Sequence, residues 1–225
     1  MVINLNVNIM VKKLYMVEGS PVANAILMAA RAFDVELELQ QLDFAKQEYL
    51  EDWYLQINPA HTVPALDDDG FIVWDSHVIL IYLAETYGSS STLFSNIPKV
   101  KYKILQMLNF NCGTVFRRLS DCLRPIFYEN QKTIEQKYLE SLKDSYKVLE
   151  RILESSKFMA ADTMTIADIS LFSSIAVTDL ILPVTDVEYP RLREWLIDMK
   201  NTDLYKAGEQ GVDTLKNALD VMLEM

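Results

Sequence analysis

The chain of 225 residues is half hydrophobic, which is enough for one large domain or two small ones with a substantial core. Its 32 acidic and 21 basic side chains give a net charge of −11, which argues against nucleic acid and against a membrane as partners, because both anionic surfaces attract basic proteins. The two cysteines are too few for a disulfide framework and lack metal-type spacing, so we expect no metal and a reducing, cytoplasmic setting.

The chain begins with a tail, residues 1–10, in which apolar residues alternate with asparagine. This tail lacks the continuous apolar run of a signal peptide, and no later stretch is long enough to span a bilayer. Residues 11–88 predict a mixed α/β domain. Its expected elements are a strand at 12–17, a helix at 21–33, a strand at 35–42, a helical segment at 46–56, short strands at 65–66 and 71–74, and a helix at 76–86. This order, βαβαββα, is typical of a thioredoxin-like domain.

Residues 89–99 read as a linker, because a glycine and a run of serines precede Pro98. Residues 100–225 then predict an all-helical domain. Apolar residues recur at helical spacing from Ile104 to Leu123, and a second helix is expected at 134–153. Thr165 and Asp168 form a capping box at the start of a third helix, and a further helix is expected at 191–200.

The most informative motif is Pro59-Ala60-His61-Thr62-Val63-Pro64. The residue before a proline is pushed into an extended conformation, so Val63 is expected to present its backbone N–H and C=O groups to whatever lies beside it. Such an edge can bind a peptide as an added strand. The motif resembles the Pro-x-His-x-Val-Pro segment of the cytosolic glutathione transferases, in which the valine backbone pairs with the cysteinyl unit of glutathione.

The resemblance covers roughly residues 12–205 and implies the glutathione transferase fold. It is closest to the insect delta and epsilon classes and leans to epsilon because of the run Trp74–Ile79. The runs Phe116–Arg118 and Asp75–Ile81 also resemble the Noppera-bo branch, which is associated with ecdysteroid production. Leu119 stands where that branch carries an acidic residue.

Ser20 is the residue that the resemblance identifies as the activator of the glutathione thiol. A hydroxyl donor near the sulfur stabilises the thiolate, and the N-terminus of the helix that begins at Pro21 adds partial positive charge. Two alternatives stay open: Ser20 is only an N-cap, or Tyr15 on the first strand is the activator. Two positions depart from the family pattern, because Val22 and Asn24 stand where relatives usually have proline and arginine.

The resemblance also implies residues that bind glutathione as co-substrate. His61 is expected at the glycine carboxylate, the Val63–Pro64 edge at the cysteinyl unit, and Tyr49 beside them. A structural role near a turn is the alternative for His61.

At the γ-glutamyl end of glutathione, Ser76 is expected to bind the carboxylate and Asp75 the ammonium group, because a helix starts there directly after a strand. His77 is expected to assist. The alternatives are that Asp75 and Ser76 only cap the helix and that His77 is an exposed helix residue.

An apolar pocket for the electrophile is expected from Phe44, Phe116, Leu119, Ser120 and Leu123, although such residues are also typical of a helix core. The resemblance implies a homodimeric enzyme that conjugates glutathione to hydrophobic electrophiles in detoxification. The alternative function is a carrier of apolar ligands, or a steroid-related protein, with little turnover. Conjugation activity measured beside glutathione affinity would separate the two.

Overall fold

A computed structural model describes residues 12–89 and 91–223, so the predicted tail at 1–10 lies outside the described residues. One mixed sheet has the strand order β2-β1-β3-β4, with β1 and β2 parallel and the other neighbours antiparallel. The strands are β1 (Lys12–Met16), β2 (Leu37–Gln41), β3 (Ala65–Asp68) and β4 (Phe71–Trp74).

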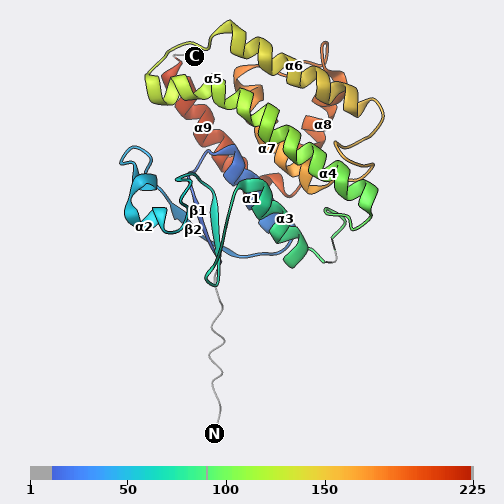
Figure 1. Ribbon diagram of the computed structural model, residues 1–225. Helices are drawn as coiled ribbons and strands as arrows, with labels where there is room; N and C mark the ends of the chain where they lie inside the picture. Colours follow the sequence, from blue (N-terminus) through green and yellow to red (C-terminus); the bar gives the residue numbers. More distant parts are fainter. Residues whose placement is uncertain (1–11, 90, 224–225) are drawn as a thin grey trace.

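The helices confirm the predicted division into a mixed α/β part followed by a helical part (Figure 1). They are α1 (Pro21–Ala32), α2 (Asp52–Leu55), α3 (Ser76–Thr86), α4 (Pro98–Phe110), α5 (Phe116–Glu129), α6 (Gln136–Leu153), α7 (Ile166–Ile181), α8 (Pro190–Lys200) and α9 (Glu209–Met222). No separate helix was predicted at α9, which contributes to the site described below.

Three predicted elements differ in detail. The strand expected at 35–42 is shorter, and the helical segment expected at 46–56 divides into the 3-10 turn Glu48–Leu50 and α2. The strand expected at 65–66 runs on to Asp68, because the hairpin needs only Asp69 and Gly70 for its turn. Both turn residues have positive φ, 55° and 83°, a conformation that suits tight hairpins.

The two faces of the sheet pack against different helices. Side chains alternate along a strand, so Leu14 and Met16 enter the main core with α1 and α3, whereas Tyr15 between them points to the opposite face. There Tyr15 packs with Tyr54 of α2 and with Ala65. This alternation decides which side chains of β1 can reach the N-terminus of α1.

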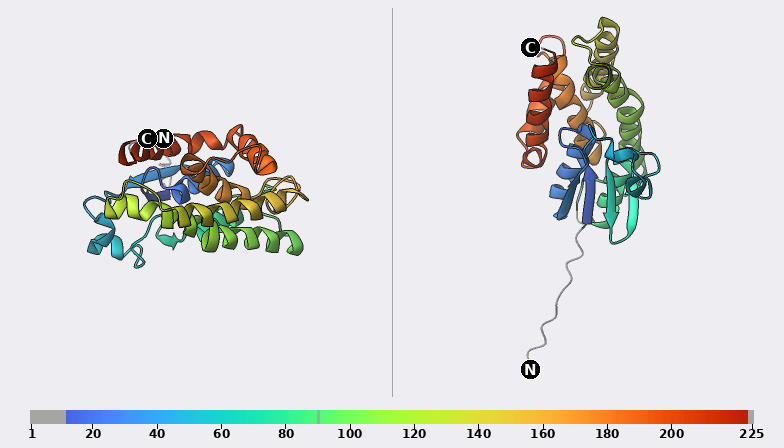
Figure 2. Two further views of the ribbon diagram at one scale, coloured as in Figure 1. Left: turned by 90° about the horizontal axis from the view of Figure 1, so that it is seen from above. Right: turned by 90° about the vertical axis from the view of Figure 1, so that its left-hand side faces the viewer.

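The long apolar run predicted from Ile104 to Leu123 forms one rod, but it is interrupted by a π-helical segment, Asn111–Val115, between α4 and α5 (Figure 1). Helix α7 contacts α1, α4 and α9, and α9 lies on the side of α7 opposite to α4 and α5 (Figure 2). Of the helices in the described part of the chain, none is long and apolar enough to cross a membrane.

The capping box at the start of α7 is confirmed. The Thr165 hydroxyl accepts from the Ala167 N–H at 3.3 Å, and the Asp168 carboxylate accepts from the Thr165 N–H at 2.9 Å. The same carboxylate accepts from the Met159 N–H at 2.8 Å and from Trp195 Nε1 at 3.2 Å. Burial raises the pKa of Asp168, and these three hydrogen bonds satisfy a carboxylate that is fully buried.

Candidate functional site

Two cavities meet at the N-terminus of α1. The first, here called the polar cavity, has a volume of about 670 Å³; the second, the apolar cavity, has about 470 Å³. The polar cavity is lined by every predicted glutathione-binding residue, namely Ser20, Tyr49, His61, Val63, Pro64, Asp75, Ser76 and His77. The apolar cavity is lined by every predicted electrophile-pocket residue, namely Phe44, Phe116, Leu119, Ser120 and Leu123. The two predicted sets therefore lie together in space, around two cavities that share Ser20, Phe44, Val63, Phe116 and Ser120.

Ser20 lines both cavities. It occupies the N-cap position of α1, with φ −68° and ψ 120°, but its hydroxyl makes no capping hydrogen bond. Gly19 before it has φ 85°, a conformation that glycine adopts without cost. The hydroxyl of Ser20 therefore does not cap the first turn of α1 and is open to a ligand.

Tyr15, the alternative activator, lines neither cavity. It is buried on the far face of β1, where its ring packs against Tyr54 and Trp53 with centroids 6.0 and 6.3 Å away. Burial raises the pKa of its hydroxyl, which keeps it protonated. The geometry favours a core role for Tyr15.

Buried Asn58 holds the Pro-x-His-x-Val-Pro loop from below. Its side-chain nitrogen donates to the Thr62 carbonyl at 2.7 Å, and the Tyr54 hydroxyl donates to the same carbonyl at 2.6 Å. His61 has φ 47°, in the left-handed region where non-glycine residues are uncommon. The backbone N–H and C=O of Val63 have no hydrogen-bond partner within the described residues, as the extended pre-proline conformation predicts.

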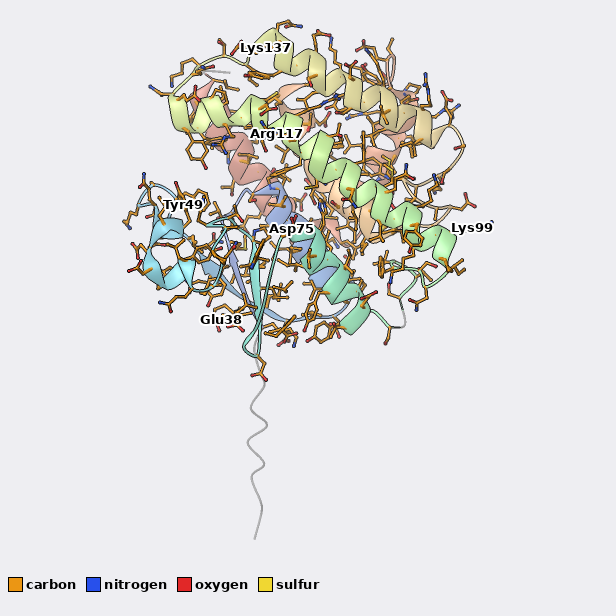
Figure 3. All side chains as sticks on the ribbon, viewed as in Figure 1. Glu38, Tyr49, Asp75, Lys99, Arg117 and Lys137 are labelled. Carbon is orange, nitrogen blue, oxygen red and sulfur yellow. The ribbon has the colours of Figure 1, made fainter. Side chains whose placement is uncertain are left out.

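Asp75 begins α3 with a strained backbone, φ 71° and ψ 120°. One carboxylate oxygen, Oδ1, caps the helix by accepting from the N–H groups of His77 at 3.0 Å and Val78 at 3.2 Å. The other oxygen has no partner in the part of the chain that the structure describes. Ser76 follows as a buried residue in the cavity wall. Figure 3 shows Asp75 at the start of α3, below Arg117 and to the right of Tyr49.

His77 is not an exposed helix residue. Its Nε2 lies 2.7 Å from the Ser170 hydroxyl of α7, and buried Asn111 of the π-helical segment donates to the same hydroxyl at 2.7 Å. Burial lowers the pKa of the imidazole, although the nearby Asp75 carboxylate opposes this shift. The chain His77–Ser170–Asn111 thus links the polar cavity to the helical region, a connection that no local motif could reveal.

Sequence analysis missed several residues of the apolar cavity. Arg124, Phe127 and Tyr128 continue the same α5 face as Ser120 and Leu123, so helical spacing carried a signal for them. Leu215 of α9 also lines this cavity, beside Gly19, and nothing in the sequence indicates that contact. Arg117 and Arg118, which precede these residues on α5, bind Asp121 and Ser145 respectively.

Asn24, which stands where relatives usually have arginine, is wedged between α1 and α9. It is 2% exposed and lies against Gly208 and Gly211; a Cβ on Gly211 would lie only 2.9 Å from its side-chain nitrogen. Neither end of its amide has a partner within the described residues. Because Asn24 is small and Gly211 has no side chain, α9 can approach the N-terminal turn of α1 closely.

The two cysteines do not meet, as expected from their helical spacing. Cys122 is buried, and Cys112 lies in the wall of the polar cavity. Burial raises the pKa of both thiols, so neither is an activated nucleophile. Residues 12–89 and 91–223 contain no group of three or more His, Cys, Asp or Glu side chains placed to hold a metal ion.

Two family models match parts of this chain. The model of the glutathione S-transferase N-terminal domain matches residues 10–85, and that of the C-terminal domain matches residues 119–203. Glutathione S-transferase 1 of Manduca sexta is 34% identical over 199 residues, which cover 88% of this chain and 91% of that protein.

Two solved structures are also similar. An epsilon-class glutathione S-transferase from the housefly, Musca domestica, superposes with a TM-score of 0.91 at 31% identity, covering 94% of this chain and 98% of that one. A glutathione transferase homologue from Drosophila mojavensis, with bound glutathione, gives 0.91 at 25% identity, covering 94% and 97%. The chain belongs to the glutathione S-transferase family of enzymes.

Proposed function

We propose that this enzyme ionises the thiol of glutathione beside Ser20 and conjugates it to hydrophobic electrophiles. The observation that carries the proposal is the position of Ser20. Its hydroxyl makes no capping hydrogen bond to α1, and the residue lies where the polar and apolar cavities meet. A hydroxyl that donates to the sulfur favours thiolate over thiol, and the N-terminus of α1 adds partial positive charge.

Glutathione would lie in the polar cavity in an extended conformation. His61 and Tyr49 would bind the glycine carboxylate, and the free backbone groups of Val63 would pair with the cysteinyl unit. At the other end, Ser76 and the N-terminus of α3 would bind the γ-glutamyl carboxylate. The unpartnered oxygen of Asp75 would accept from the γ-glutamyl ammonium group.

The acceptor occupies the apolar cavity. The thiolate forms a carbon–sulfur bond to its electrophilic carbon, while a leaving group departs or an activated double bond takes up a proton from solvent. The thiol proton passes to solvent when glutathione ionises. Proximity of the two substrates and the lowered thiol pKa supply the rate gain. Residues 11–88 thus bind glutathione, and residues 100–225 supply half of the side chains around the acceptor site.

The finer assignments follow the same reasoning. The run Trp74–Ile79 and the likeness to the housefly enzyme support an epsilon-class, cytoplasmic detoxification enzyme. A homodimer is supported by exposed apolar residues beside the polar cavity: Trp74 on edge strand β4 is 43% exposed, and Val78 on α3 is 49% exposed.

The test uses Ser20→Ala. The pKa of enzyme-bound glutathione, followed by thiolate absorbance in the ultraviolet, should rise by about one unit, and conjugation of a generic aromatic halide should fall about tenfold at pH 7. Glutathione affinity, measured by calorimetry, should change much less. Tyr15→Phe is the control and should keep the wild-type titration curve. An unchanged curve in Ser20→Ala would contradict the proposal.

A second candidate is a carrier of apolar ligands, including steroid-related ones, with little turnover. The substitutions Val22 and Asn24 favour it, because they remove the usual proline and arginine beside the thiol site. Tight binding of apolar ligands by the wild-type protein, together with no conjugation at saturating glutathione, would support this candidate.

A further inference from the structure

A cation without an acidic partner lies where the two cavities meet. Arg124 of α5 lines both cavities, and its guanidinium makes no ion pair or side-chain hydrogen bond with any residue of the described ranges. The other arginines of this helix are engaged: Arg117 Nε lies 3.1 Å from Asp121, and Arg118 Nη1 donates to Ser145 at 3.0 Å. Arg124 is therefore the arginine of α5 that is open to a ligand.

The guanidinium of Arg124 lies near the ring of Tyr128, one turn further along α5. Its Cζ is 5.6 Å from the centroid of the Tyr128 ring, four residues on, which is within the range of a cation–π contact. Tyr128 lines both cavities as well. Because the N–H groups of a guanidinium project in its plane, a guanidinium that stacks on a ring keeps them free to donate.

Apolar side chains surround this charge on one side. The neighbouring walls include Phe44, Phe116 and Phe127, whereas Arg124 itself is exposed, so water screens its charge in part. The other charged residue in the apolar cavity is Glu18, which does not line the polar cavity and accepts from Gln210 Nε2 of α9 at 2.7 Å.

We propose that Arg124 selects acceptors that carry an anionic group, a carboxylate or a sulfonate, beside an apolar body. The role of this selection in conjugation rests on the function proposed above. The planar fork of arginine matches two oxygens of such an anion. Tyr49, His61 and Asp75 line the polar cavity alone, whereas Arg124 also lines the apolar cavity, so an anion that it holds there belongs to the acceptor. With a net charge of −11 the protein has no general attraction for anions, so a local cation must hold one.

The experiment compares two fluorescent probes that share one apolar skeleton: anilinonaphthalene sulfonate, which is an anion, and phenylnaphthylamine, which is neutral. Arg124→Met should weaken the sulfonate about five- to tenfold and change the neutral probe less than about twofold. Arg117→Met is the matched control, because it removes the same charge from the same helix outside both cavities, and it should leave both affinities unchanged. Arg124→Lys keeps the charge without the fork and should recover part of the preference.

Equal effects of Arg124→Met and Arg117→Met, or no effect of either, would overturn the proposal. A loss of glutathione affinity in Arg124→Met with unchanged probe binding would overturn it too, because the guanidinium would then bind the glycine carboxylate. A wild-type protein that prefers the sulfonate probe but conjugates nothing would refute the proposed function while leaving the anion selection standing.

Discussion

The polar cavity and the helical body behind it are organised in different ways. Around the cavity, several contacts join residues that are close in sequence: Asp75 caps the helix that starts beside it, and Asn58 holds the nearby Thr62. In the helical body the decisive contacts are long-range, such as the bond from Trp195 to Asp168. Substitutions at the cavity should therefore reduce ligand affinity and spare stability, and substitutions in the body should do the reverse.

The largest effect is expected for Asp168→Ala. The substitution leaves the buried donors of Met159, Thr165 and Trp195 without their acceptor, which should cost about 3 kcal/mol of unfolding free energy and about 6–12 °C in Tm. Thermal unfolding measures it. Thr165→Ala removes one cap and should cost about 1 kcal/mol. Exposed Asp162→Ala is the control. If Asp168→Ala kept normal stability but lost glutathione affinity, the proposed contrast between the polar cavity and the helical body would be wrong.

Gly211→Ala tests the contact between α9 and α1. The added methyl would overlap the Asn24 amide, and overpacking of this kind costs about 2 kcal/mol. Gly113→Ala is the matched control, because a Cβ there meets no atom within 4 Å and alanine favours helical structure. Denaturant unfolding should show a lower midpoint for Gly211→Ala alone. The double variant Asn24→Ala/Gly211→Ala should recover much of the loss; failure to recover would place the strain elsewhere.

Asp75→Asn separates binding from capping. Asparagine is as good an N-cap as aspartate and also tolerates positive φ, so Tm should stay near that of the wild type. The loss of the negative charge should weaken glutathione binding about tenfold, as measured by calorimetry. Asp69→Asn is the control, because Asp69 also has positive φ but lies in the hairpin turn. Unchanged affinity in Asp75→Asn would leave Asp75 as a cap only.

The smallest effect is expected at the link between the two regions. Burial lowers the pKa of His77 below its ordinary 6.5, so the folded protein binds this proton less readily than the unfolded chain does. The stability that the neutral imidazole contributes is present above pH 6.5 and is lost as the pH falls through the lowered folded pKa. Tm should therefore fall more steeply with acidification in the wild type than in His77→Gln. Ser170→Ala keeps the imidazole and should retain the steep slope; equal slopes in all three would exclude this link.

Much of the fold was predictable from the sequence, because the signals are local. Hydrophobic periodicity predicted the strands and helices, and the spacing of Thr165 and Asp168 predicted a cap that the structure confirms. The residues around the polar cavity were predicted from the resemblance to the glutathione transferases, whereas local signals alone left capping as an alternative for Ser20, Asp75 and Ser76. Hydrogen bonds between near neighbours depend on only a few residues, so a short stretch of sequence specifies them.

The tertiary structure alone decided the rest. It placed the Tyr15 side chain in a buried cluster. It also left the Ser20 hydroxyl without a capping hydrogen bond, between two cavities. It brought Leu215 against Gly19, joined His77 to α7, and left Arg124 without an ion-pair partner among the described residues. Each of these outcomes depends on which face of one element packs against another that is distant in sequence. Periodicity shows that a residue lies on a face, but only packing shows what that face meets.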